Sequence, residues 1–129
     1  MKRYLPFIVM FLVVLLVPSC NGTKTDPSVK AVESYITALV NNDSARLSSL
    51  SCADWEPNAL LELDSLQAVN TRLDGLTCSV VGNEGAFTQV NCKGKIIATY
   101  NNEDQEIDLS VRNYQVLQQG SDYLVCGYQ

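Results

Sequence analysis

NCKGKIIATYNNEDQEIDLSVRN (residues 91–113) contains two runs in which apolar and polar side chains alternate, separated by a polar turn. A period of two predicts β-strands with one face in water and the other on a core. With the turn centred on Asn102-Glu103, the predicted inward pairs are Ala98–Ile107, Ile96–Leu109, Gly94–Val111 and Cys92–Asn113. The wet face then holds Gln89, Asn91, Lys93, Lys95, Glu106, Asp108, Ser110 and Arg112. This stretch therefore predicts an antiparallel sheet covered on one side.

The second half of the chain is predicted to form four strands, at residues 76–81, 86–100, 105–117 and 123–128. Helices are predicted before them at residues 27–41 and 44–50, and a third helix opens at Pro57. This third helix is predicted to turn Leu60, Leu61, Leu63, Leu66 and Val69 inward and Glu62 and Gln67 to water. Residues 72–75 are expected to end the helical half. The predicted fold class is α+β, with N-terminal helices packed on one face of a curved four-stranded antiparallel sheet.

The N-terminus is typical of an exported protein. Residues 1–19 have a basic start and then an apolar run, too short for the about 20 apolar residues of a membrane-spanning helix. Val17-Pro18-Ser19-Cys20 resembles the bacterial lipobox, in which a lipid is attached to the cysteine. The alternative is an ordinary signal peptide with a free cysteine beside its cleavage site. Residues 1–19 are thus expected to be a lipoprotein signal peptide, residues 20–27 a tether and residues 28–129 a single domain.

The chain has five cysteines, and lipidation at Cys20 would leave two pairs. The predicted disulfides are Cys78–Cys92, across the first hairpin, and Cys52–Cys126, between the helical half and the last strand. A zinc site or a redox pair is the alternative, but neither a CxxC spacing nor a histidine occurs in the sequence. Disulfides persist outside the reducing cytosol, where the leader would deliver the protein.

The net charge of residues 20–129 limits the kinds of partner that the protein is expected to bind. Residues 20–129 carry seven lysines and arginines against fourteen acidic residues, a net charge of −7. Such a surface repels nucleic-acid phosphates, so nucleic acid is not an expected partner. The acidic run at residues 103–108 could hold calcium, but it lacks the glycine and spaced oxygen ligands of an EF-hand loop. A hairpin turn with solvated charges explains the run, and no cofactor is expected.

Three helices followed by a long-stranded sheet, with the opening VESYITALVNND (residues 32–43), resemble the nuclear transport factor two-like superfamily. More narrowly, the chain is similar to small bacterial lipoproteins of that superfamily with no assigned function, and the cystatin-like arrangement is the main rival. The resemblance implies a cone-like domain. Enzymes of the superfamily place Asp, His or Tyr inside the cone, whereas this chain has no histidine and no carboxylate among its predicted inward strand positions. The resemblance thus implies a binding or scaffolding member rather than a catalyst.

Four residues are candidates for a pocket at the mouth of the cone: Tyr35, Trp55, Asn113 and Tyr114. The alternative is that the aromatic residues only cap the core, and that Asn113 is a satisfied structural amide. A dehydratase or isomerase using Asp54, Tyr35 or Tyr114 is the second functional hypothesis. The sheet face that carries Lys93, Lys95, Glu106, Asp108 and Arg112 could pair in a homodimer. The sequence thus predicts an extracytoplasmic protein anchored to the bacterial cell membrane through a lipid on Cys20, with a non-catalytic role and no identifiable ligand.

Overall fold

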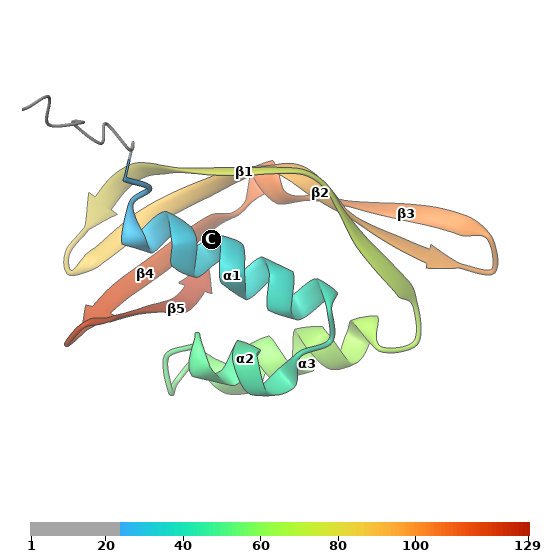
Figure 1. The fold of residues 1–129 in the computed structure, drawn as a ribbon, viewed down its shortest axis with the longest axis horizontal. Helices are drawn as coiled ribbons and strands as arrows, with labels where there is room; N and C mark the ends of the chain where they lie inside the picture. Colours follow the sequence, from blue (N-terminus) through green and yellow to red (C-terminus); the bar gives the residue numbers. More distant parts are fainter. Residues whose placement is uncertain (1–23) are drawn as a thin grey trace, which may run out of the picture.

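The computed structural model describes residues 24–129, so Cys20 and the leader lie outside the described residues (Figure 1). This part of the chain is α+β, with three α-helices and a five-stranded antiparallel sheet that does not close. The helices are α1 (Pro27–Val40), α2 (Ser44–Ser49) and α3 (Glu56–Leu66). The strands are β1 (Asn70–Glu84), β2 (Phe87–Tyr100), β3 (Glu103–Asp108), β4 (Asn113–Gln119) and β5 (Asp122–Tyr128), with a 3-10 turn, η1 (Leu109–Val111), between β3 and β4.

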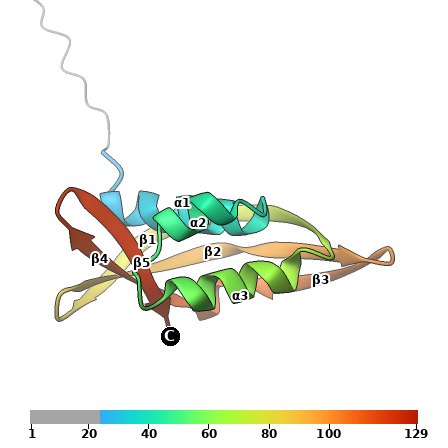
Figure 2. The same ribbon diagram turned by 90° about the horizontal axis from the view of Figure 1, so that it is seen from below.

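Helix α1 covers the sheet and supplies much of the core. It begins where the sequence predicts, because Pro27 suits a first turn and the Asp26 carboxylate accepts a 2.8 Å hydrogen bond from the Ser28 amide. Its apolar face is buried, with Val32, Ile36 and Leu39 fully enclosed. In Figure 1, α1 lies nearest to the strands, and α2 and α3 lie on the side of α1 away from β1. Seen from below, α2 overlaps α1, and α3 runs beside them (Figure 2).

Strand β2 is the centre of the sheet. It pairs with β1 along one edge and, along the other, with β4 through its first half and with β3 through its second half. Strand β5 pairs with β4. Strand β1 starts at Asn70, so the prediction that residues 72–75 end the helical half is wrong. A bulge at residues 74–77 interrupts the alternation of apolar and polar residues in β1. At the bulge, Gly75 and Gly94 (φ +69° and +105°) let the backbones of β1 and β2 approach closely.

The predicted third strand, residues 105–117, is broken into β3 and β4, which is why the sheet has five strands instead of four. The preceding turn is Asn101-Asn102, both at positive φ, so Ile96 pairs with Ile107 instead of the predicted Leu109. The turn η1 then shifts the register by one residue, and Asn91, instead of Cys92, pairs with Asn113. A shift of one residue moves the following side chains of a strand to the other face of the sheet. Arg112 is therefore inward, and Asn113 faces outward.

The structure contains two disulfides, and they join the cysteines that the sequence analysis paired. Cys78 and Cys92 are directly opposite on β1 and β2, with Cα atoms 4.0 Å apart, because a second bulge near Gly82 adjusts the register. Cys52 and Cys126 have Cα atoms 4.9 Å apart and tie the segment before α3 to β5. Two disulfides are typical of proteins outside the reducing cytosol. Within residues 24–129, no helix is both long and apolar enough to cross a membrane.

Candidate functional site

Three of the four predicted pocket residues meet between the helices and the sheet. The indole Nε1 of Trp55, just before α3, donates a 3.0 Å hydrogen bond to the hydroxyl of Tyr35 on α1. Tyr114 on β4 packs edge-on against Tyr35, with ring centroids 6.2 Å apart. Both tyrosines are fully buried. A fourth ring, Tyr128 on β5, lies edge-on to Trp55 and Tyr114, with centroids 5.4 and 5.5 Å away. We call these four side chains the aromatic cluster.

Asn113 does not belong to this group, so its prediction as an inward pocket residue is wrong. Its side chain is exposed on the outer face of the sheet and accepts a 3.0 Å hydrogen bond from Asn91 Nδ2. The same Asn91 amide nitrogen donates to the backbone carbonyls of Ser110 and Arg112. The asparagine pair thus holds the turn η1 against β2 from outside.

Glu62 and Arg112, which were both predicted to face water, form an ion pair against the aromatic cluster. Arg112 Nη1 lies 2.7 Å from Glu62 Oε1, and the two side chains are only 17% and 18% exposed. The guanidinium also lies over the Tyr128 ring, 4.3 Å from its centroid, in a cation–π contact. The register shift at η1 turns Arg112 inward.

The buried face of α3 includes the predicted Leu63 and Leu66, but it is rotated toward Glu62 and away from Leu61. Ala59, Leu63 and Leu66 are buried, and positions three and four apart share a helix face, so Glu62 lies beside them. Leu61, which was predicted to be inward, is instead 70% exposed. A signal for Glu62 was therefore present in the sequence: Ala59, Leu63 and Leu66 define one face without Leu61.

Two polar atoms of this site are buried without a hydrogen-bond partner: Glu62 Oε2 and the Tyr114 hydroxyl. The Tyr114 hydroxyl lies beside the Arg112 guanidinium without forming a well-aligned hydrogen bond to it. Burial raises the pKa of Tyr114 to about 12. Burial also raises the pKa of Tyr35 well above its ordinary value. Although burial alone would lower it, the Glu62 carboxylate holds the pKa of Arg112 above its usual range. At neutral pH the site thus has neutral tyrosines around a charged pair.

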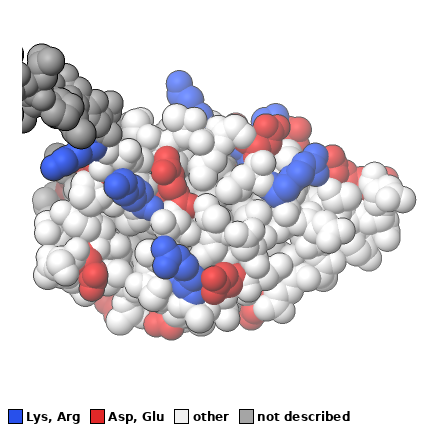
Figure 3. Space-filling model, in the orientation of Figure 1, with Lys and Arg blue, Asp and Glu red and all other residues white. Residues whose placement is uncertain are grey.

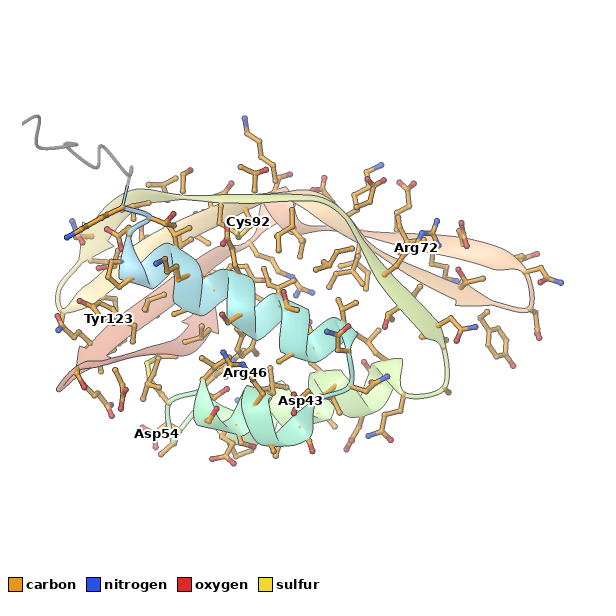
Figure 4. All side chains as sticks on the ribbon, in the orientation of Figure 1. Asp43, Arg46, Asp54, Arg72, Cys92 and Tyr123 are labelled. Carbon is orange, nitrogen blue, oxygen red and sulfur yellow. A yellow bond between two sulfur atoms is a disulfide. The ribbon has the colours of Figure 1, made fainter. Side chains whose placement is uncertain are left out.

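The carboxylate at the aromatic cluster is paired with a cation. Glu62 Oε1 lies 2.7 Å from Arg112 Nη1, whereas Glu62 Oε2 is buried without a hydrogen-bond partner. Asp54, named for the enzyme hypothesis, is exposed at the edge of the molecule, so it does not join Tyr35 and Tyr114 (Figure 4). It lines a separate hollow of about 270 Å³ beside Cys126 and Phe87. Residues 24–129 contain no group of three His, Cys, Asp or Glu side chains placed to hold a metal ion.

The larger hollows lie on the outer side of α1. One, of about 450 Å³, lies against α1 and α2, and the other, of about 470 Å³, reaches the β4–β5 turn. They share Lys30 and Ser34, and Arg46 and Tyr123 mark their two ends (Figure 4). On this face, positive and negative side chains are interspersed and form no single patch of one sign (Figure 3). The hollows are open, and none of them is lined by a residue of the aromatic cluster.

The chain matches no protein-family model, no curated protein and no solved structure.

Proposed function

We propose that this chain is an exported, lipid-anchored protein of the bacterial cell envelope with a non-catalytic binding or scaffolding role. We place it, again as a proposal, in the nuclear transport factor two-like superfamily with its cone-like domain. Three helices ahead of a long-stranded antiparallel sheet, with α1 against the sheet, support this assignment. The cysteines support the anchor, because the two disulfides use four of the five and leave Cys20 for another role.

One observation carries the non-catalytic role: the space between α1, α3, β4 and β5 is occupied by the aromatic cluster and the Glu62–Arg112 pair. Glu62 is paired with Arg112 and the Tyr35 hydroxyl accepts a hydrogen bond from Trp55, so these groups hold the domain together and are engaged with one another instead of with a substrate. An enzyme using this interior would need Glu62 released from Arg112. Binding is therefore expected on the outer surfaces.

The outer face of the sheet is the surface we propose for a second copy of the chain. It carries Lys93, Lys95, Glu106 and Asp108, whose mixed signs suit self-pairing. Arg112, which was predicted on this face, is not part of it.

The experiment is the intact mass of the protein from its native membrane, with Cys20→Ser as the matched variant. We expect a mature chain that begins at Cys20, heavier by the diacyl group and lighter by two hydrogen atoms for each disulfide. Cys20→Ser should release the domain from the membrane with both disulfides intact. A mature chain that keeps its leader, or a Cys20→Ser protein retained in the membrane fraction, would overturn the anchor.

A further inference from the structure

The hairpin of β2 and β3 extends past the helices, at the end of the molecule far from the start of α1 (Figures 1 and 2). Strand β3 pairs with β2 in a continuous register from Tyr100–Glu103 to Lys95–Asp108. Within residues 24–129 it pairs with no other strand, so its second edge is free. All of its residues are exposed except Ile107, which is half-buried. This edge is a regular, accessible template for another strand.

Turn geometry decides which backbone groups face the free edge. Asn101-Asn102 is a two-residue turn with both φ values positive, so the flanking pair Tyr100–Glu103 exchanges both of its backbone hydrogen bonds. Hydrogen-bonded pairs alternate with unbonded ones along an antiparallel ladder. The N–H and C=O groups of Asp104, Glu106 and Asp108 therefore point away from β2, to the open side.

The same three residues place a row of carboxylates on one face of the edge. Arg72 Nη2 lies 3.3 Å from Asp104 Oδ2, and Lys95 Nζ lies 2.6 Å from Glu106 Oε2. Both cations come from the β1 and β2 side, as Figure 4 shows for Arg72, and they hold the strand in place. The third carboxylate, Asp108, accepts hydrogen bonds from the Ser110 amide and hydroxyl, at 2.8 and 2.7 Å, and has no ion pair within residues 24–129. On its inner face, Ile107 is the apolar position.

We propose that the free edge of β3 binds an extended peptide segment of a partner protein, in which lysine or arginine alternates with apolar or small residues. The basic side chains would stand opposite Asp104, Glu106 and Asp108, and the alternate side chains would extend the apolar inner face beside Ile107. Opposite charges across a strand pair stabilise it, and like charges weaken it. A second copy of β3 is disfavoured, because it would place carboxylates against carboxylates.

The other edges of the sheet fit this role less well. Strand β1 has two bulges, near residues 74–77 and 80–82, and bulges disrupt added pairing. Strand β5 already exchanges backbone hydrogen bonds with Leu50 and Cys52, at 2.8 and 2.9 Å. The proposal does not depend on the lipid anchor or on the absence of catalysis.

The test is a titration of the mature protein, disulfides intact, with a synthetic peptide of the length of β3 in which lysine alternates with valine and threonine. A peptide of the same composition with its lysines in one block is the control. We expect the amide signals of Asp104, Glu106 and Asp108 to shift and to gain protection from hydrogen exchange. The amides of Gln105 and Ile107 face β2, so they should be protected before and after addition. No shift, shifts elsewhere, or equal binding of the control peptide would overturn the proposal.

Two variants at one position separate backbone pairing from charge. Glu106→Thr keeps the open N–H and removes the charge, so binding should weaken about threefold. Glu106→Pro also removes that N–H, which no bond to β2 uses, so the hairpin should persist and binding should fall by a further factor of about five. Glu106→Lys should weaken binding of the lysine peptide and favour a matching glutamate peptide, which tests the charge pairing even if the proline variant misfolds. Equal binding by Glu106→Thr and Glu106→Pro would contradict the strand pairing.

Discussion

Replacing Arg112 with methionine tests the central contact of the aromatic cluster. The substitution keeps an unbranched side chain over Tyr128 but leaves the Glu62 carboxylate without the guanidinium that lies 2.7 Å away. Removing one partner of a buried ion pair costs about 3 to 5 kcal/mol, because the other charge stays buried. Since both side chains keep nearly a fifth of their exposure, we expect the lower end, about 3 kcal/mol. The sulfur–aromatic contact of methionine offsets part of the lost cation–π contact.

The assay is urea unfolding of the disulfide-intact protein, arranged as a double-mutant cycle with Glu62→Leu. The double variant should lie within about 1.5 kcal/mol of the wild type, because an apolar pair replaces both charges. Arg46→Met is the control: Arg46 is exposed and has no ion pair in the described chain, so its loss should change the free energy of unfolding by less than about 0.5 kcal/mol. A cost for Arg112→Met no larger than that of Arg46→Met, or a double variant equal to the sum of the singles, would refute the reasoning.

Three further predictions concern the same core. Tyr35→Phe should destabilise the domain by about 1 to 2 kcal/mol in urea unfolding, because it leaves the Trp55 N–H without its acceptor. Tyr114→Phe should change stability by less than about 1 kcal/mol, because the Tyr114 hydroxyl that it removes has no hydrogen-bond partner. The free energy of unfolding should fall as the pH rises from about 10 to about 12, because the raised pKa keeps Tyr114 protonated in the folded state while the unfolded chain ionises; Tyr114→Phe should make the fall shallower in unfolding curves taken across that range. Removing Cys52–Cys126 (serine at both positions), which closes 74 residues, should cost about 1.5 kcal/mol more than removing Cys78–Cys92, which closes 14, as thermal unfolding would show; an equal cost would contradict the loop-entropy argument.

The elements that the sequence predicted well have local causes. Helix α1 is set by its apolar period, by Pro27 and by the Asp26 cap, all within one short segment. The disulfides followed from counting the cysteines and from the places of Cys78 and Cys92 on neighbouring strands, which left Cys52 in the helical half to pair with Cys126 on the last strand. The presence of a helical half and a stranded half followed from the change of period, which was predicted at residue 76 although the first strand begins at Asn70.

Register was not predictable in the same way, because it depends on single residues at turns. Asn101 and Asn102 both accept positive φ, which moves the hairpin turn by one position from the predicted centre. The Asp108 carboxylate then accepts a 2.8 Å hydrogen bond from the Ser110 amide, and this cap starts η1. Alternation of apolar and polar residues continues through such a turn in the sequence, even though the faces of the sheet exchange there.

The prediction that Arg112 faces water is wrong because the faces of the sheet exchange at η1. Arg112 sits in a segment whose alternation places it in water, Glu62 was predicted to be exposed although it lies on the face of Ala59, Leu63 and Leu66, and the two residues are 50 positions apart in the chain. Neither burial makes physical sense alone, because an unpaired buried charge is strongly unfavourable. Each becomes acceptable only through the other, so the pair can be recognised only after α3 and β4 are placed together. This dependence is why the double variant, and not either single one, measures what the pair contributes to the fold.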